Sequence, residues 1–200
     1  MGDAAEALPD FDALYHQIEA LPQGVTGEIL DPGALRTMSR PARAHRYTAR
    51  RLGSVLSGVD RNLGGVGWWI EVEAEVRFGP RLLVPDLAGW RADRVPVFPD
   101  ESPITLCPDW ACEVLSPTTA RDDRLKKLPR YIAEGVAHVW LVDPEQRFVE
   151  VFAALDGRPL LIASGDTDAT AALPPFDGVF DLARWWLPTP EGGSAGAEGE

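Results

Sequence analysis

Two carboxylates, Asp86 and Glu113, each lie within a short and otherwise apolar run of the sequence. Asp86 belongs to residues 82–90 and Glu113 to residues 110–116, and alternation along a strand would place each acid on a face with apolar neighbours. Burying an unpaired carboxylate is costly, so such a group must shift its pKa or find a cation. One buried acid is usually a satisfied structural residue, whereas two on separate strands of one sheet suggest a shared ligand. Because Mg²⁺ prefers carboxylate oxygens and water, the pair predicts a metal site.

A lysine on the segment that follows these runs is the next candidate. Lys127 and Tyr131 are one helical turn apart, and Asp123 lies one turn before Lys127. One interpretation is a solvated Asp123–Lys127 pair on the helix surface. The apolar seam of this helix would be formed by Leu125, Leu128 and Ile132. The other interpretation is that Pro129 distorts the helix and that the long stem of Lys127 reaches over the sheet edge.

Three further residues are weaker candidates. Glu28 is an isolated acid, and Glu73 could be only the solvent face of its strand. His45 lies in an arginine-rich segment, where a lone histidine is more often surface or core filler than a catalytic group. The sequence contains no glycine-rich nucleotide-binding motif, no HExxH and no GxSxG.

The charge of the chain is unevenly distributed. The net charge of −12 argues against a nucleic-acid partner, because phosphate binding needs a basic surface. Residues 34–131, however, hold sixteen of the nineteen Lys and Arg residues. Six of them form an arginine cluster over residues 36–51: Arg36, Arg40, Arg43, Arg46, Arg50 and Arg51. The cluster is either a solvated helix face or a local cationic surface that steers a polyanion.

Length and composition exclude several classes of protein. The 200 residues fit one domain over 1–187, with residues 1–9 frayed and an acidic Gly/Pro-rich tail over 188–200 disordered. No apolar run approaches the ~20 residues that span a bilayer, and we expect no signal peptide. Two cysteines five residues apart match no zinc or disulfide pattern. The expectation is a soluble cytoplasmic protein.

Periodicity and turn signals place the candidate residues on secondary structure. Helices are predicted over 10–20 and 41–57, and a third opens at a Thr119–Asp122 capping box and ends near Glu134. The predicted strands are 27–31, 68–78, 82–90, 110–116 and a hairpin of 138–144 and 147–155. This order predicts a mixed sheet flanked by helices, of the α/β or α+β class.

Three segments together resemble a known family. They read LLVPDLAGWR (82–91), PDWACEVLSPTTARDDRLKKLPRYIAEGVAHVWLVDP (108–144) and FVEVF (148–152). They are similar to the Uma-type restriction endonuclease family of the PD-(D/E)xK nuclease superfamily. The resemblance implies a restriction-endonuclease-like core in which Asp86 and Glu113 are the two motif acids. Leu115 stands where the superfamily motif has its lysine, and Lys127 matches the displaced lysine of this family.

The resemblance also implies an activity. The expected protein is a magnesium-dependent endonuclease, with Mn²⁺ as a substitute ion, that cleaves nucleic acid, DNA in the first instance. Asp86 and Glu113 would hold the metal and act with Lys127. The supporting residues would be Glu28, His45, Glu73 and Tyr131, and the nucleic-acid backbone would contact Arg43, Arg46 and Arg50. A homodimer is compatible with this activity, because cutting both strands needs two sites.

Two alternatives remain open at this point. The displaced lysine and the acidic net charge also suit a catalytically degenerate nuclease fold that binds nucleic acid or protein. A metal-dependent hydrolase of a non-nucleic substrate is the other.

Overall fold

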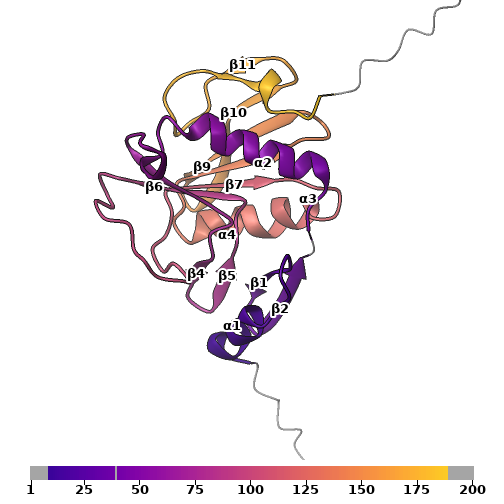
Figure 1. Ribbon diagram of the computed structural model, residues 1–200, viewed down its shortest axis with the longest axis vertical. Helices are drawn as coiled ribbons and strands as arrows, with labels where there is room; N and C mark the ends of the chain where they lie inside the picture. The colour runs from indigo at the N-terminus through magenta and orange to yellow at the C-terminus, as the bar shows by residue number, and fades with distance from the viewer. Residues whose placement is uncertain (1–8, 39, 189–200) are drawn as a thin grey trace, which may run out of the picture.

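The centre of the structure, a computed structural model that describes residues 9–38 and 40–188, is a mixed sheet of six strands. The strand order is β10-β9-β8-β7-β6-β3, with β7 and β8 parallel and the other neighbouring pairs antiparallel (Figure 1). The strands are β3 (Trp68–Val72), β6 (Leu87–Arg91), β7 (Trp110–Val114), β8 (His138–Asp143), β9 (Phe148–Leu155) and β10 (Arg158–Asp166). The predicted mixed sheet is therefore confirmed. Residues 1–8 and 189–200, which hold nearly all of the predicted frayed end and disordered tail, lie outside the described residues.

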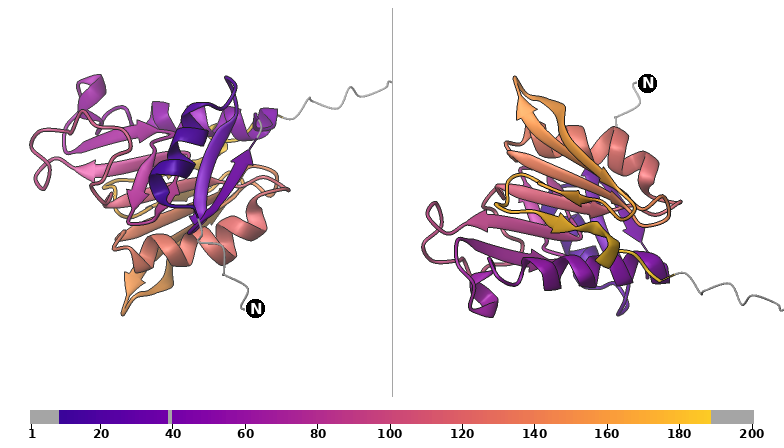
Figure 2. Two further views of the ribbon diagram at one scale, coloured as in Figure 1. Left: turned by 90° about the horizontal axis from the view of Figure 1, so that it is seen from below. Right: turned by 90° about the horizontal axis from the view of Figure 1, so that it is seen from above.

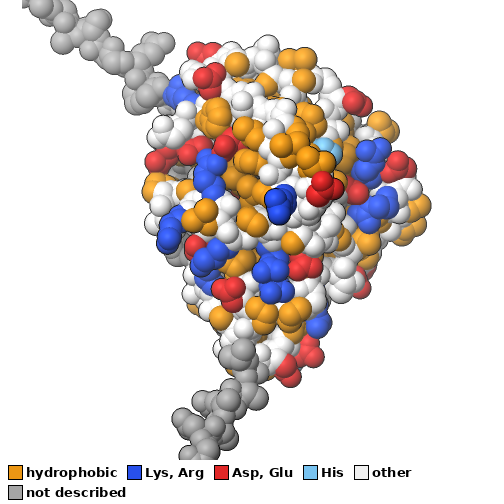
Figure 3. Space-filling view, turned by 180° about the vertical axis from the view of Figure 1, so that it is seen from behind, with side chains coloured by type: hydrophobic (Ala, Val, Ile, Leu, Met, Phe, Trp, Pro, Cys, Tyr) orange, Lys and Arg blue, Asp and Glu red, His pale blue; other side chains and the backbone are white. Residues whose placement is uncertain are grey.

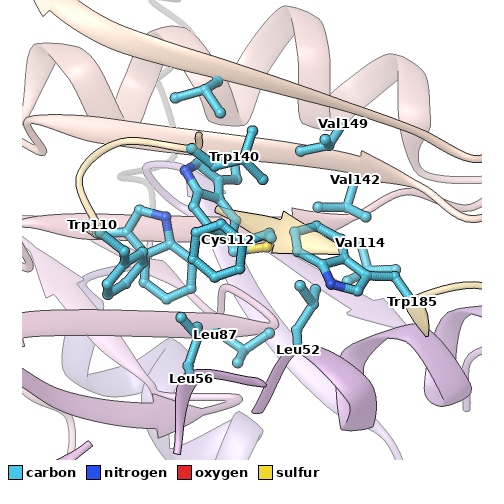
Figure 4. Close-up of a cluster of buried hydrophobic side chains, with 14 of the residues drawn as sticks. Leu52, Leu56, Leu87, Trp110, Cys112, Val114, Trp140, Val142, Val149 and Trp185 are labelled. Atoms are coloured by element: carbon cyan, nitrogen blue, oxygen red, sulfur yellow. The ribbon is translucent and has the colours of Figure 1, made fainter. Parts of the chain in front are cut away.

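One face of this sheet is covered by α2 (Arg43–Leu56), and the helical stretch around α4 (Leu128–Ala133) covers the other (Figure 2). The inward residues of α2 recur at helical spacing: His45, Thr48, Leu52 and Leu56. Under α2, side chains from five strands of the sheet and from the C-terminal segment form an apolar cluster, part of which is drawn in Figure 4. Its labelled members are Leu52, Leu56, Leu87, Trp110, Cys112, Val114, Trp140, Val142, Val149 and Trp185. The sheet is thus buried on both faces, and its central strands lie deep in the molecule.

A second, smaller sheet carries the N-terminal part of the chain. Its antiparallel order is β2-β1-β5-β4. These strands are β1 (Thr26–Asp31), β2 (Ala34–Met38), β4 (Val76–Phe78) and β5 (Arg81–Leu83). The helix α1 (Phe11–Glu19) packs on it through Phe11, Leu14 and Ile18, and Asp10 caps the helix by accepting a hydrogen bond from Ala13 N at 2.8 Å. The predictions of a helix over 10–20 and of a strand over 27–31 are confirmed.

The prediction of one continuous strand over 68–78 is wrong. The chain leaves the central sheet after β3 and joins the small sheet as β4. Between them Glu73 adopts a left-handed backbone (φ 52°), and its N–H donates to the carbonyl of Asp86 at 3.1 Å. The run over 82–90 is interrupted in the same way, because Pro85 and Asp86 separate β5 from β6. Both breaks fall where the two sheets meet.

The helix predicted from Thr119 to Glu134 exists but is not regular. It consists of α3 (Ala120–Asp122), a π-helical turn η2 (Asp123–Lys127) and α4. The predicted capping box is wrong, because the Thr119 side chain makes no capping hydrogen bond to the helix N-terminus. The predicted apolar seam is also wrong at Leu125, which is 64% exposed. The helix ends near Glu134 as predicted, and Gly135, at φ 102°, follows it.

The remaining elements complete the description. The predicted helix over 41–57, the strand over 110–116 and the hairpin of β8 and β9 are confirmed. The sequence did not predict β10, which extends the hairpin at the edge of the central sheet. The other short elements are η1 (Arg61–Leu63), β11 (Thr170–Ala171), β12 (Phe180–Asp181) and η3 (Leu182–Arg184). Among the described residues, no helix combines the length and apolarity needed to cross a membrane.

Candidate active site

The candidate residues gather around one groove of about 1510 Å³. Its walls come from β2, the N-terminal half of α2, the break between β5 and β6, the end of β7 and the β7–α3 loop; β2, α2 and α3 lie near one another in Figure 1. The predicted site residues that line it are His45, Glu73, Asp86, Glu113 and Lys127. Glu28 and Tyr131 do not line it but contact residues that do. The structure therefore brings the two predicted acids and the lysine to one place.

Glu113 is the fourth of the five residues of β7 and is only 4% exposed. Its Oε1 accepts a hydrogen bond from the Tyr131 hydroxyl at 2.6 Å and lies 2.8 Å from Lys127 Nζ. Burial raises the pKa of Glu113 well above its usual range; Lys127 opposes this shift, and the nearby carboxylates of Asp123, Asp86 and Glu28 add to it. The carboxylate is thus held by neutral and cationic donors in a place where negative charge is in excess.

Lys127 is the positive centre of the site and is 2% exposed. Its Nζ lies 2.8 Å from Glu28 Oε1 and 4.0 Å from Asp123 Oδ1, in addition to its contact with Glu113. Burial alone would lower the pKa of Lys127, but the charges of Glu113, Glu28 and Asp123 raise it above its ordinary value. Lys127 therefore remains an ammonium, and the prediction of a solvated Asp123–Lys127 pair is wrong because both residues are buried.

Asp86 lies at the break between β5 and β6, where it can contact two neighbouring elements. Its Oδ2 accepts a hydrogen bond from the backbone N–H of Val114, the residue after Glu113, at 2.7 Å. Its Oδ1 lies 3.1 Å from His45 Nε2 on α2. The Val114 contact draws Asp86 to the strand that carries Glu113, and the charge of Asp86 raises the pKa of Glu113. The two acids converge even though Asp86 is outside any strand.

Glu28 connects the small sheet to this site. It is fully buried on β1, and its Oε1 accepts a hydrogen bond from Val84 N at 2.8 Å besides contacting Lys127. Its Oε2 has no hydrogen-bond partner within the described part of the chain. Tyr131, also fully buried, extends from α4 behind Glu113. Burial and the Glu113 charge raise the pKa of Tyr131, so its hydroxyl stays protonated and donates.

Arginines form one wall of the groove. Arg46 and Arg50 line it from α2, whereas Arg43, also on α2, does not. Arg36 and Arg40, which the sequence analysis placed in the same arginine cluster, line it as well. Their signal was present in the arginine cluster over 36–51, but only the path of β2 and of the segment before α2 brings these two side chains to the groove.

Asp123 is the acid that the sequence analysis missed as a site residue. It lines the groove, and burial raises its pKa, while Lys127 and a hydrogen bond from Thr119 act against that shift. Its charge contributes to raising the pKa of Glu113. Helical periodicity does not predict Asp123 as a site residue, because in a regular helix its side chain would point away from the sheet.

The donor chemistry of the site fits a divalent cation. Within the described residues, no three His, Cys, Asp or Glu side chains form a ready-made metal cluster. Two converging carboxylates, Asp86 and Glu113, are nevertheless sufficient for Mg²⁺, which keeps several water ligands. The carboxylates of Glu28 and Asp123 also raise the pKa of Glu113. The single charge of Lys127 does not balance these three acids and Asp86. A divalent cation would compensate this excess of negative charge.

Fold and site together define a restriction-endonuclease-like α+β protein. The sequence model of the Uma2 family, described as "Putative restriction endonuclease", matches residues 10–183. The chain belongs to this family, which confirms the resemblance described above. The fold is shared with the crystal structure of "a putative nuclease belonging to DUF820 from Anabaena variabilis ATCC 29413", at a TM-score of 0.68 and 22% identity over 89% of this chain and 97% of that chain. A comparison with curated proteins found no match.

Proposed function

We propose that this protein is a magnesium-dependent endonuclease that hydrolyses phosphodiester bonds in DNA. One observation carries the proposal: a lysine ammonium contacts Glu113 at 2.8 Å, next to Asp86, in a groove with arginines on its wall. Family membership supports the reaction class. Asp86 and Glu113 would hold Mg²⁺ or Mn²⁺, which would supply Lewis acidity and acidify water at the scissile phosphate.

The other site residues would have distinct roles in this reaction. Lys127 stays charged next to the site and would orient the attacking water or neutralise charge that develops on the phosphate. The Tyr131 hydroxyl and Glu28 hold Glu113 and Lys127 in place, and His45 Nε2 orients the Asp86 carboxylate. Glu73, at the groove edge, would assist in placing the ion or its water ligands.

The nucleic-acid backbone would lie along the arginine wall. Arg46 and Arg50 would contact phosphates without reading sequence, and Arg36 and Arg40 extend the same surface. Arg43 would contact the backbone only beyond the groove. The hydroxyls of Ser116, Thr118 and Thr119, on the β7–α3 loop that also lines the groove, would be further donors to phosphate.

The wider setting is part of the proposal. Cleavage of both strands would use two copies of the site, so the working form would be a homodimer. The protein would act in the cytoplasm. Residues 1–187 would form the nuclease domain.

The first experiment measures cleavage and ion binding in parallel. Wild-type protein should nick or cut plasmid DNA in Mg²⁺ or Mn²⁺ but not in EDTA, and Asp86→Ala and Glu113→Ala should each lose essentially all of this activity. Lys127→Ala should lower the rate by about 10²–10³, typical for the loss of one preorganised charge. Full activity of Asp86→Ala would refute the assignment.

Calorimetric titration with Mg²⁺ separates the nuclease from a degenerate fold. An active site should bind the ion with an affinity that falls in both Asp86→Ala and Glu113→Ala. DNA binding without ion uptake or turnover would favour a binding module. A turnover that does not depend on ionic strength would favour a small neutral substrate, because phosphate contacts weaken with salt. Parallel RNA and DNA substrates test the choice of nucleic acid.

A further inference from the structure

The helix that carries Lys127 contains one wide turn at the groove. In η2 the N–H of Leu128 donates to the carbonyl of Asp123, an i→i+5 bond that closes a turn with one residue more than an α-helical turn. Each residue of an α-helix turns the chain by about 100°, so one extra residue rotates the preceding side chains by a comparable angle relative to α4. π-turns of this kind are frequent at functional sites.

The burial of two residues shows this rotation. In an unbroken α-helix Leu125 would lie on the sheet side with Leu128 and Ile132, and Asp123 would lie on the opposite side. In the structure Leu125 is 64% exposed and Asp123 is only 4% exposed. An apolar side chain has thus been turned out to solvent and a carboxylate turned into the site. The hydrophobic effect opposes this exchange, so a specific local cause is needed.

Pro129 supplies that cause. It occupies the start of α4, has no N–H to donate, and its ring would clash with the carbonyl four residues earlier, that of Leu125, in a regular helix. A wide turn immediately before the proline would move that carbonyl away from its ring. The sequence position of this proline therefore determines where the helix register changes.

The inward turn places Asp123 beside the lysine ammonium. Asp123 Oδ1 lies 4.0 Å from Lys127 Nζ, and Thr119 holds the carboxylate by a side-chain hydrogen bond. With Glu28 and Glu113 at 2.8 Å, Asp123 completes a set of three carboxylates around one cation. Loss of any one of them would let the long lysine stem adopt other rotamers.

We propose that Asp123 is a positioning residue for Lys127, and that the π-turn maintained by Pro129 is the device that brings it into the groove. The kinetic part of this inference rests on the proposed nuclease function. The structural part does not, because it concerns only how firmly Lys127 is held.

The first test is independent of activity and uses the fact that Lys126 and Lys127 are the only lysines in the sequence. Acetylation with a small reagent, read by mass spectrometry, should modify Lys126, whose side chain is 52% exposed, and spare Lys127, whose side chain is 3% exposed. In Asp123→Asn, which can still accept the Thr119 hydrogen bond, Lys127 should be acetylated several-fold faster relative to Lys126. Pro129→Ala should produce the same change.

The second test is steady-state cleavage of DNA. Asp123→Asn should lower kcat by about 10- to 100-fold, as for other residues that orient a site group, with KM unchanged. Asp123→Glu should recover part of the rate. Pro129→Ala should also lose rate while its Tm stays equal or rises, because alanine restores a helical N–H and is the better helix former.

The matched control is Leu14→Ala on α1, a core residue remote from the groove that should destabilise the fold without touching Lys127. It should keep both the wild-type acetylation ratio and the wild-type kcat below its melting temperature. The inference is overturned if Asp123→Asn leaves Lys127 protected and kcat unchanged, or if Leu14→Ala reproduces its effects. The role of Pro129 is overturned if Pro129→Ala behaves as wild type. Absence of turnover in the wild type would refute the nuclease proposal alone, and the acetylation ratios would still decide the positioning.

Discussion

One lysine ammonium holds together acidic residues from three distant parts of the chain. Glu28 comes from β1, Glu113 from β7 and Asp123 from η2, and each lies within 4.0 Å of Lys127 Nζ. In a buried site the removal of one ionic partner costs more than the pair itself contributes, because the remaining charges are left uncompensated. Lys127 is thus both a candidate for the chemistry and a structural centre of the site.

This dual role leads to a prediction on stability. Lys127→Met should lower the free energy of unfolding by about 3–5 kcal/mol at pH 7, since Glu28 and Glu113 lose their cation. Urea denaturation measures this. Lys126→Met is the control, and its exposed pair with Asp122 should contribute no more than about 1 kcal/mol. An equal effect of the two substitutions would contradict the assigned role.

The same variant makes a pH prediction. The carboxylates raise the pKa of Lys127 in the folded protein, so the folded state retains this proton longer than the unfolded state. Its stabilising contribution is complete below the unfolded pKa of about 10.4 and is lost as the pH rises further. The stability gap between wild type and Lys127→Met should therefore narrow above pH ~10.4. A stability difference that grows with rising pH would contradict a raised pKa of Lys127.

At the scale of elements, breaks in regular structure place the site. Asp86 follows Pro85 between two strands, Glu73 turns the chain from one sheet to the other, and Asp123 begins a π-turn. Regular strands and helices could not present these groups to a common groove. The elements next to each break must then be held firmly, because a small shift would separate the groups.

Close packing of β6 is one such constraint. A Cβ added at Gly89 would lie 3.0 Å from Trp110 Cε3, 3.1 Å from Ile70 Cδ1 and 3.2 Å from Trp68 Cε3. Gly89→Val should therefore destabilise the fold by about 1–3 kcal/mol and displace the strand that follows Asp86. Thermal unfolding measures the first effect and Mg²⁺ affinity the second. Gly53→Ala on α2, with open space around the added carbon, should instead gain up to ~1 kcal/mol.

At the scale of the whole molecule, local charge matters more than net charge. The protein carries −12 overall, and in the view from behind, acidic and basic side chains are interspersed (Figure 3). The groove lining is also mixed, since Asp86, Glu113 and Asp123 line it, but four arginines lie on it as well: Arg36, Arg40, Arg46 and Arg50. A polyanion is attracted by the field where it binds, and at physiological salt a Debye length of about 8 Å screens distant acids.

The arginine wall gives a prediction in salt dependence. Arg46→Ala and Arg50→Ala should each weaken DNA binding and reduce the slope of log K against log salt by roughly 0.9 for each lost phosphate contact. Arg43→Ala, on the same helix but outside the groove lining, should have a smaller effect on both quantities. Fluorescence anisotropy over a salt series provides the comparison. Equal slopes for all three variants would contradict a path of the DNA backbone along the groove.

The amino-acid sequence alone determined which strands are buried, which helices flank them and which two acids are out of place in apolar runs. It could do so because the periodicity of apolar residues and the residue preferences of turns are local properties of the sequence. Residue type and spacing also pointed to Lys127 with Tyr131 and, more weakly, to Glu28, and the family resemblance implied their roles.

The tertiary structure decided the rest, because the deciding contacts join residues far apart in the sequence. Glu28 meets Lys127 only when the small sheet packs beside the central one, and Arg36 and Arg40 reach the groove along β2 and the segment that leads to α2. Asp123 turns inward because the helix changes register at the π-turn, whereas a prediction from periodicity assumes a regular helix. Local patterns assume regular elements, and this site is assembled where the elements are interrupted.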